Sequence, residues 1–387
     1  MDSVDQYVAR ADALYHDVSY RSVAEWKTRT GKKAAGHLPV YAPREIIDAA
    51  GMLPVAMHGA GDQVEIIRGD AYFQSYICQL PRSTIELAMS GRLDDIDAFL
   101  FPSTCDVIRN LSGMWKMLFP KKFVRYLDLP QNFDRKVAGR FWAGELRHLY
   151  ADLCALNGTT PSDDALRLSL ARFSANRRAV ASLMALRASE PWRAPAAEAY
   201  LIIRAGDVMP VEEHTAFIEG YLAAAQGADR PMRDYTRVVV TGAFCEQPPL
   251  ELIRTLERAG CYLVWDDFTV GARFLEGDVS LAGDPIEALA QAFLNQSVKN
   301  ACVYEPDGKK GEWLVNTVRD TRADGVVFAA PSFCDPALLE QPMLVTALER
   351  AGIPHTSFKY AENLGQFQVI REQAGTFSDG LRLWSNA

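Results

Sequence analysis

The sequence predicts an α/β protein of two lobes, each built on a small, doubly wound parallel sheet. Two distant segments nearly repeat each other: residues 97–106 read Asp-Ala-Phe-Leu-Phe-Pro-Ser-Thr-Cys-Asp, and residues 324–335 read Asp-Gly-Val-Val-Phe-Ala-Ala-Pro-Ser-Phe-Cys-Asp. Short apolar runs between turn residues are typical of buried strands in a parallel sheet. Around both segments, strand-like and helix-like stretches alternate, which is the pattern of a parallel α/β fold.

Turn and cap residues define the elements of the first lobe. A polar helical segment, covering roughly the first 35 residues, leads to a short helix between Pro43 and Gly51, where glycine suits the left-handed end of a helix. A second helix, over residues 82–90, is expected to open at Pro81. The strands expected in this lobe are residues 52–57, 96–101 and 123–127.

A long helical segment separates the two alternating halves. Residues 161–190 carry no strand signal, and a helix start at Pro161 leads an Ala-, Arg- and Leu-rich run to residue 188. Pro210 starts a second run to residue 225, so the helical segment covers residues 161–225. We interpret this segment as a helical connection with a domain boundary near residue 195. The expected division is an N-terminal lobe of residues 1–195 and a C-terminal lobe of residues 196–387.

The second lobe repeats the alternation of the first. Its expected strands are residues 237–241, 262–265, 325–329 and 355–358, and its expected helices are residues 249–259, 285–298, 310–322, 336–351 and 365–374. Open α/β sheets bind ligands at the carboxyl ends of their strands. Two such sheets facing each other predict one shared site in the cleft between the lobes.

Composition and charge narrow the classes of function. The 387 residues carry a net charge of −8, which gives no reason to expect nucleic acid or a membrane surface as a partner. No uncharged apolar run reaches the ~18 residues of a membrane span. The N-terminus is acidic and lacks the apolar region of a signal peptide. We therefore expect a cytoplasmic protein that does not cross a membrane.

The seven cysteines are the most informative residues for chemistry. Their odd number argues against a disulfide framework, and no pair has the Cys-x-x-Cys spacing, so the fold must assemble any metal site from distant positions. Cys105 and Cys334 close the two repeated segments at strand ends. Cys78 precedes a helix whose positive end, together with Arg82, favours the thiolate. Cys245 follows another strand and is a further candidate for the same cleft.

Two metals suit three thiolates held between two lobes. An iron–sulfur cube, [4Fe–4S], with one open iron is the first, and zinc held by three cysteines is the competing metal. The structural alternative is that each cysteine is a half-buried core thiol. Cys154, Cys261 and Cys302 lie in apolar contexts and are expected in the core.

Candidate proton donors are few. Tyr360 and Glu362 lie at the end of the last expected strand, while Asp106, Asp335 and Glu246 adjoin cysteines. The alternative role is helix capping and solvation, which we favour for the two aspartates.

Two further motif observations bear on the site. The sequence contains no Gly-x-Gly-x-x-Gly, no P-loop and no Gly-x-Ser-x-Gly elbow, so we expect no nucleotide to bind to this chain. Asp266 and Asp267 end a strand, and a structural ion pair with Arg273 is expected.

Seven motifs, read in order, resemble the 2-hydroxyacyl-CoA dehydratase and benzoyl-CoA reductase family. They are the run Pro39 to Gly51, Cys78 before its helix, Pro-Ser-Thr-Cys105-Asp, Thr241-Gly242, Trp265-Asp266-Asp267 through Arg273, Pro-Ser-Phe-Cys334-Asp-Pro336, and Tyr360 to Gln368. The resemblance covers nearly the whole chain. The length of the chain and the residues within these motifs are most similar to the smaller cluster-bearing subunits of the ATP-dependent benzoyl-CoA reductases.

The resemblance implies a [4Fe–4S] cluster held between the lobes by Cys78, Cys105 and Cys334. It implies an iron–sulfur subunit of an oxidoreductase that reduces benzoyl-CoA to a cyclohexadiene carboxyl-CoA in the anaerobic degradation of aromatic compounds. The implied partners are a related larger cluster-bearing subunit, ATP-hydrolysing activase subunits fed by ferredoxin, and benzoyl-CoA itself.

Cluster type and reaction stay open at this level. Some relatives hold a larger double-cubane [8Fe–9S] cluster, for which Cys245 would be an added ligand. Some carry a cysteine after the Asp-Asp pair, where this chain has Phe268-Thr269. The alternative functions are a subunit of an (R)-2-hydroxyacyl-CoA dehydratase, which is a lyase, and a non-enzymatic two-lobed binding protein.

Overall fold

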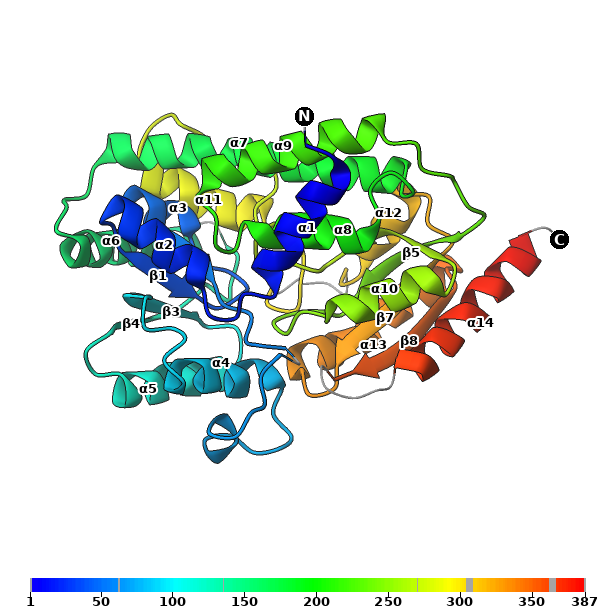
Figure 1. The fold of residues 1–387 in the computed structure, drawn as a ribbon, viewed down its shortest axis with the longest axis horizontal. Helices are drawn as coiled ribbons and strands as arrows, with labels where there is room; N and C mark the ends of the chain where they lie inside the picture. Colours follow the sequence, from blue (N-terminus) through cyan, green and yellow to red (C-terminus); the bar gives the residue numbers. More distant parts are fainter. Residues whose placement is uncertain are drawn as a thin grey trace.

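The computed structural model describes residues 2–61, 63–134, 136–269, 271–303, 309–361 and 367–385. Its centre consists of two separate four-stranded sheets, one in each half of the chain, with all paired strands parallel (Figure 1). The predicted α/β class with two parallel-sheet lobes is therefore confirmed.

The first sheet has the strand order β2-β1-β3-β4. Its strands are β1 (Ala34–His37), β2 (Leu53–Ala56), β3 (Ala98–Pro102) and β4 (Phe123–Leu127). Its helices are α2 (Arg21–Thr30), α3 (Arg44–Ala49), α4 (Gln79–Met89), α5 (Asp106–Leu118) and α6 (Ala138–Asn157), with a 3-10 turn at Gly69–Ala71. Helices α4 and α5 lie on one side of this sheet, and α2, α3 and α6 lie on the other (Figure 1).

Among the described strands, β1 is the one that the sequence did not predict, and the helices α5 and α6 were not predicted either. The Ala-Ala-Gly-His sequence of β1 lacks the β-branched and aromatic residues that mark strands. It nevertheless lies in the middle of the sheet, with Ala35 opposite Pro54 on one side and Ala98 on the other. A Cβ on Gly36 would lie 2.9 Å from the Sδ of Met57. The tight packing between neighbouring elements therefore requires small residues here.

The second sheet has the strand order β6-β5-β7-β8. Its strands are β5 (Thr236–Thr241), β6 (Cys261–Asp266), β7 (Gly325–Pro331) and β8 (His355–Tyr360). Its helices are α10 (Leu250–Arg258), α12 (Glu312–Asp320), α13 (Asp335–Ala351) and α14 (Phe367–Ser385), whereas α11 (Pro285–Gln296) of the same half of the chain packs on the first lobe.

Side chains of the second sheet alternate between two cores. Val238 and Val240 pack in the core that contains the buried side chains of α10 and α14, whereas Val239, Val326 and Phe328 pack with α12 and α13. Both faces are thus covered by helices, as a doubly wound sheet requires. This arrangement explains why the strands are continuous apolar runs.

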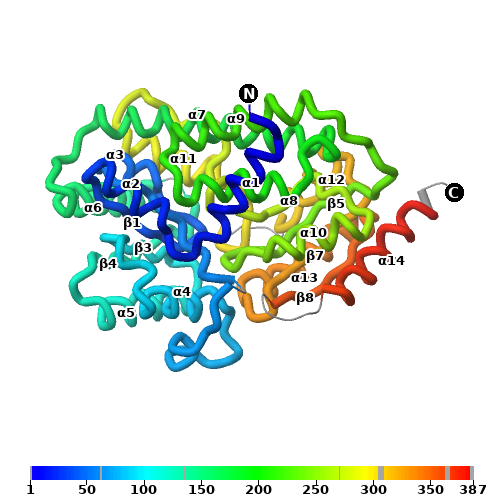
Figure 2. Tube along the Cα trace, in the orientation of Figure 1, coloured from blue at the N-terminus to red at the C-terminus, as the bar shows by residue number. Residues whose placement is uncertain are grey.

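A helical layer joins the two lobes. It contains α1 (Val4–Tyr15), α7 (Asp163–Ser189), α8 (Ala196–Ala205) and α9 (Val211–Gly227), and α7 and α9 run along the top of both lobes in Figures 1 and 2. Two buried ion pairs anchor α7. Arg177 Nη1 lies 2.5 Å from Glu45 Oε1 in the first lobe, and Arg187 Nη1 lies 2.5 Å from Asp266 Oδ2 in the second. One helix therefore fixes the lobes relative to each other.

The packing does not follow the order of the chain. Helix α1 packs against α8, and α11 packs against α6. Phe293 of α11 lies in the core of the first lobe, with its ring centroid 5.2 Å from that of Trp142. Segments on each side of residue 195 thus pack against segments from the other side. The predicted division near residue 195 stays a prediction.

The ends of two predicted helices differ from the structure. Helix α4 begins at Gln79, so Pro81 lies inside its first turn rather than opening it. Proline is tolerated there because the first amides of a helix have no intrahelical acceptor. Helix α14 continues to Ser385, beyond the predicted end at residue 374.

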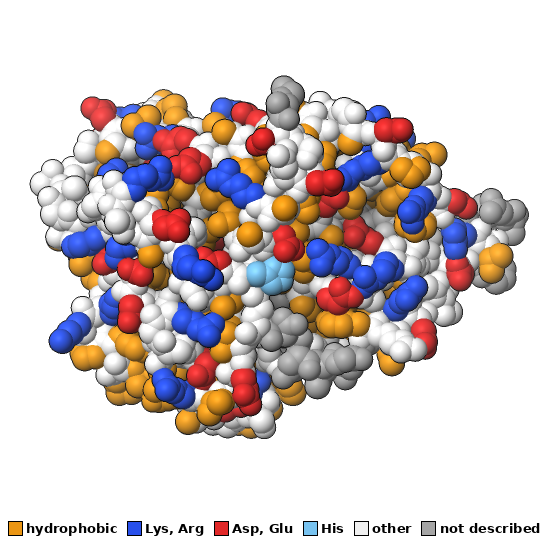
Figure 3. Space-filling view, in the orientation of Figure 1, with side chains coloured by type: hydrophobic (Ala, Val, Ile, Leu, Met, Phe, Trp, Pro, Cys, Tyr) orange, Lys and Arg blue, Asp and Glu red, His pale blue; other side chains and the backbone are white. Residues whose placement is uncertain are grey.

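Charged side chains of both signs share the visible surface (Figure 3). On the face shown in Figure 3, basic and acidic side chains are interspersed rather than gathered by sign. None of the described helices combines the length and the apolar character needed to cross a membrane.

Candidate functional site

Three of the predicted cysteines occupy the same structural position. Cys78, Cys105 and Cys334 are the residues that immediately precede α4, α5 and α13. Cys105 and Cys334 follow the carboxyl ends of β3 and β7, as the repeated segments predicted. Each thiol therefore lies at the positive end of a helix, where negative charge is favoured.

Five cysteines gather at this place. Cys245, in the loop after β5, is 4% exposed, and burial raises the pKa of its thiol well above the usual value. Negative charge on Cys105, Cys334, Cys302 or Cys78 would raise the pKa further, so all four lie within electrostatic reach of Cys245. The fold thus brings together the three predicted ligands and the additional candidate.

Cys302 joins this cluster, although the sequence placed it in a core. It is half-buried, and its Sγ lies 3.6 Å from the carbonyl oxygen of Thr104. The Sγ of Cys245 lies 3.8 Å from Oγ1 of the same threonine. Cys302 also packs against the core of the first lobe, so the expectation captured only part of its surroundings. An apolar context in the sequence gave no signal of the neighbouring thiols.

The remaining cysteines lie where the sequence predicted. Cys154 on α6 is 1% exposed and Cys261 at the start of β6 is fully buried. Each belongs to the hydrophobic core of its lobe. The two are therefore useful reference thiols away from the cysteine cluster.

Burial and backbone amides act in opposite directions on the thiols of the site. Burial raises the pKa of Cys334, and the amides of Ala337 and Cys245, which donate to its sulfur, lower it. The pKa that results from these opposing effects is about 12. Burial likewise raises the pKa of Cys105, opposed by amides of Val107 and Ile108. Without a cation these thiols stay protonated, whereas a bound metal would deprotonate them.

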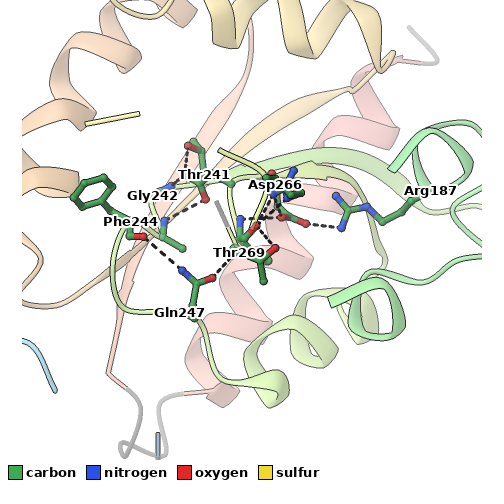
Figure 4. A network of polar contacts seen from close by, with 11 residues as sticks. Arg187, Thr241, Gly242, Phe244, Gln247, Asp266 and Thr269 are labelled. Atoms are coloured by element: carbon green, nitrogen blue, oxygen red, sulfur yellow. Dashed lines mark hydrogen bonds and ion pairs between the residues drawn. The ribbon is translucent and has the colours of Figure 1, made fainter. Parts of the chain in front are cut away.

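A polar network fixes the loop that carries Cys245. The carboxylate of Asp267 accepts hydrogen bonds from the Thr241 hydroxyl at 2.8 Å and from the amides of Gly242 at 2.7 Å and Ala243 at 3.3 Å. Burial raises the pKa of Asp267 to about 7. The end of β5 is thus tied to the end of β6 (Figure 4).

The same network continues on the other side of the loop. Thr269 donates its amide to the side chain of Gln247 at 2.6 Å, and the Gln247 amide group donates to the carbonyl of Phe244 at 3.5 Å (Figure 4). Asp266 pairs with Arg187 and also with Arg273, whose Nη2 is 3.1 Å away. The predicted structural pair of Asp266 and Arg273 is confirmed.

Glu246 connects the two lobes. It is 2% exposed, and its Oε2 accepts a hydrogen bond from the amide of Gln79 at 2.8 Å, with the Leu80 amide as a second donor. Burial raises the pKa of Glu246 to about 7, while these amides and Arg82 lower it. The hydroxyl of Tyr360 donates to the backbone carbonyl of Glu246 at 3.0 Å.

Two of the other candidate acids, Asp106 and Asp335, are exposed to solvent. Asp106 pairs with Arg109 at 2.7 Å and its side chain is 84% exposed, and Asp335 is an exposed first residue of α13. Both match the capping and solvated role that the sequence favoured. Glu362 lies outside the described residues.

The donor set fits an iron–sulfur cluster. It consists of thiols from both lobes at helix N-termini, with backbone amides aimed at sulfur, which are the ligands and hydrogen bonds that such clusters use. Within the described ranges, no three or more His, Cys, Asp or Glu side chains converge as ligands of a metal ion. A cluster distributes its thiolates over several iron atoms, whereas zinc requires all its ligands around one centre.

Comparison with known proteins gives similarity along the whole chain. A family model described as 2-hydroxyglutaryl-CoA dehydratase, D-component, matches residues 39–381. A benzoyl-CoA reductase subunit of Thauera aromatica is 51% identical over 385 residues, which cover 99% of this chain and 100% of the relative.

Two dehydratase subunits are more distant. Lactoyl-CoA dehydratase subunit beta of Anaerotignum propionicum is 29% identical, covering 93% of this chain and 95% of the relative. The (R)-2-hydroxyglutaryl-CoA dehydratase subunit beta of Acidaminococcus fermentans is 27% identical, with 90% and 93% covered. The similar proteins thus include a reductase and dehydratases.

Proposed function

The chain belongs to the family of the 2-hydroxyglutaryl-CoA dehydratase D-component, and we propose that it is an iron–sulfur subunit of a benzoyl-CoA reductase, equivalent to the Thauera aromatica relative. The observation that carries this proposal is the 51% identity over the full length of a benzoyl-CoA reductase subunit, against 29% and 27% for the two dehydratase subunits. The proposed reaction is the ATP-driven, two-electron reduction of the aromatic ring of benzoyl-CoA to a cyclohexadiene carboxyl-CoA. It would serve the anaerobic degradation of aromatic compounds.

The proposed ligands of a [4Fe–4S] cluster are Cys78, Cys105 and Cys334. Their shared position ahead of three helices supports this assignment. When bound, such a cluster supplies single electrons at potentials that reach down to about −700 mV. The nearby Cys245 and Cys302 are the added thiols that a double-cubane [8Fe–9S] cluster would use.

The chain itself contributes electrostatics and exclusion of water. Amides at the starts of α5 and α13 donate to Cys105 and Cys334, which stabilises thiolate character there. Burial of Cys245 and Cys334 keeps water away from this side of the site. Exclusion of water lowers the local dielectric constant, which strengthens the interaction of these amide dipoles with negative charge on the thiolates.

Tyr360 and Glu362 are the proposed proton donors. The side chain of Tyr360 is buried close to the cysteines, and its hydroxyl donates to the carbonyl of Glu246. Donation of that proton to a ring would require the hydroxyl to leave this carbonyl. Glu362 follows two residues later in the sequence.

A partner subunit is proposed to cover the site. Phe333, just before α13, is 47% exposed, and Leu339 and Met343, within α13, are 74% and 48% exposed. Tyr76, just before α4, is 64% exposed. Apolar side chains exposed beside a functional site are typical of protein interfaces. The proposed partners are a related larger cluster-bearing subunit, an ATP-hydrolysing activase and ferredoxin. The sequence of this chain contains no P-loop, which agrees with a separate ATPase.

The first experiment measures iron and acid-labile sulfide per chain in the complex purified without oxygen. About four of each supports one cube, and about eight iron points to the double-cubane cluster. Cys334→Ala should lose the share of iron that belongs to this chain's cluster, about four iron for one cube, together with ring reduction. Cys261→Ala, a buried thiol outside the cluster, should keep both. Absence of iron from the wild-type complex, or full iron and activity in Cys334→Ala, would contradict the proposal.

Substrate assays separate the remaining functions. The family model and two relatives are dehydratase components, so the lyase is the specific alternative. The reconstituted complex should reduce benzoyl-CoA with ATP and a low-potential donor and should not dehydrate a 2-hydroxyacyl-CoA. The opposite result would favour the dehydratase, and no turnover of either together with no iron would favour a binding protein.

A further inference from the structure

A single carboxylate of the second lobe caps a helix of the first lobe. Glu246 follows Cys245 in the loop after β5, and its side chain accepts the amides of Gln79 and Leu80. These are the first two residues of α4, and the residue before them is Cys78. One buried side chain therefore connects the backbone next to Cys78 with the loop that carries Cys245.

Helix α4 obtains no such cap from its own sequence. Cys78 occupies the N-cap position and makes no side-chain capping hydrogen bond. The first amides of a helix need acceptors when they are buried, and residues with side-chain oxygens normally supply them. A thiol is a weak acceptor. Glu246 supplies the missing acceptor from the other lobe.

The loop that presents Glu246 is held on both sides. The hydroxyl of Tyr360, at the end of β8, donates to the Glu246 carbonyl at 3.0 Å. Asp267 binds the amides of Gly242 and Ala243 before it, and the side chain of Gln247 is held by Thr269 after it (Figure 4). The carboxylate is thus fixed to the second sheet rather than to a loose loop.

We propose that Glu246 is a positioning residue that holds Cys78 in register with the cysteines of the second lobe. This inference rests on the proposed function, in which Cys78 binds the cluster. Glu246 acts through α4: its carboxylate fixes the first turn of the helix, and that turn fixes the Cys78 thiol. Loss of the acceptor leaves two buried amides unsatisfied and frees this turn from the second lobe.

The test begins with the metal-free chain and hydrogen exchange of the segment 78–84. Pro81 has no amide, and the amides of Arg82, Ser83 and Thr84 lie further into the helix, so exchange read at single amides separates Gln79 and Leu80 from the rest of the segment. Glu246→Ala should speed the exchange of these two amides about tenfold, the effect of a lost helix cap. It should also speed alkylation of Cys78 several-fold relative to Cys105. Glu246→Gln keeps an acceptor oxygen and should restore both rates.

A matched control comes from a second capping carboxylate. Glu257 accepts the amides of Ala196 and Ala197 at the start of α8, away from the cysteine cluster. Glu257→Ala should speed exchange at α8 and leave the exchange of α4 and the alkylation of Cys78 unchanged. A general loosening of the fold would instead change both regions in both variants.

Gln79→Pro tests the same contact from the other partner, should Glu246→Ala fail to fold. Proline is favoured at the first helical position, and Cys78, with φ −55° and ψ 156°, already has the conformation that precedes proline. The change removes one donor to Glu246 and leaves the helix intact. By itself it should speed the exchange of Leu80 and the alkylation of Cys78. Where Glu246→Ala folds, its addition to Gln79→Pro should have a smaller effect than it has in the wild type.

The loaded complex supplies a further readout. Glu246→Ala should lose iron faster to a chelator and change the electron paramagnetic resonance signal of the reduced cluster, and Glu246→Gln should restore both. Wild-type exchange and alkylation in a folded Glu246→Ala chain, or failure of glutamine to rescue, would overturn the inference. Because exchange is read on the metal-free chain, it decides this inference separately from the iron content that tests the proposed function.

Discussion

At the scale of single residues, Gly242 shows how closely the loop after β5 approaches its neighbours. Its φ of +116° lies in the region that side chains rarely adopt, and a Cβ there would lie 2.9 Å from the carbonyl oxygen of Ala329. Thr241-Gly242 was one of the motifs that suggested the family. The structural reason for the glycine is the passage of the chain against β7 on its way to Cys245.

Gly242→Ala should therefore destabilise the protein by about 1–3 kcal/mol, because backbone strain and a clash act together. Guanidinium denaturation measures the change in the free energy of unfolding. Gly283→Ala is the matched control, since its φ is +75° but no atom lies within 4 Å of the added Cβ. Equal losses in the two variants would show that the contact with Ala329 adds nothing.

His214 is held in its neutral form by partners on both ring nitrogens. Its Nε2 lies 3.0 Å from the carbonyl of Ile202, which needs a donor, and its Nδ1 lies 3.0 Å from the amide nitrogen of Asn176, which needs an acceptor. Burial, aided by the charge of Arg44, lowers the pKa of His214 to about 4. Protonation would place an N–H group against the Asn176 donor.

Because of this histidine, the protein should become less stable as the pH decreases below about 6.5. Below pH 6.5 the unfolded chain binds a proton at His214 that the folded chain does not bind until about pH 4. The stabilisation is therefore present above pH 6.5 and is lost as the pH falls toward 4. At pH 5 the loss amounts to about 2 kcal/mol. His214→Gln should flatten the pH dependence of unfolding over this window. An unchanged slope in that variant would assign the effect to other groups.

At the scale of elements, α7 connects the two lobes through buried ion pairs. Its two buried arginines, Arg177 and Arg187, reach Glu45 in one lobe and Asp266 in the other. Asp266 is also one residue from Asp267, which fixes the loop of Cys245. The helical connection that the sequence predicted thus also stabilises the architecture of the site.

Arg177→Met should reduce the free energy of unfolding by about 3–5 kcal/mol, because it leaves Glu45 buried without its charged partner. Glu45→Gln in the same chain should recover part of the loss. The adjacent Arg178 forms an exposed pair with Asp278, with both side chains 58% exposed, so Arg178→Met should cost about 1 kcal/mol or less. Denaturation of the three variants measures the difference, and similar losses for the two single changes would refute it.

The elements themselves were predictable where local signals were strong. The strands β4 and β7 and the helix α13 follow from apolar runs, prolines and glycines in the sequence. Strand β1 was missed because its small residues carry no strand propensity and are selected by packing against Met57 and Ile96. The early start of α4 was missed because its cap, Glu246, is supplied by a residue far away in the sequence.

At the scale of the whole molecule, the site is a consequence of two parallel sheets meeting at their carboxyl ends. Strand ends of both lobes deliver Cys105, Cys334 and Cys245, and the segment after α11 delivers Cys302. Crossing elements hold the lobes together, with α1 packed on α8 and α11 packed on α6. The cysteine cluster therefore depends on the relation between the lobes more than on either lobe alone.

The sequence by itself determined the fold class, the resemblance to the family and the three cysteines with strand or helix signals, because these depend on local patterns. The strand end before Cys245 had also made it a candidate. Only the tertiary structure revealed that Cys302 lies with these cysteines and that Glu246 caps α4, because contacts between distant segments leave no periodic trace in the chain. The sequence read Cys302 as a core residue for the same reason. Local propensity describes the neighbours along the chain, whereas the surroundings of these cysteines are set by residues of both lobes that are distant in the sequence.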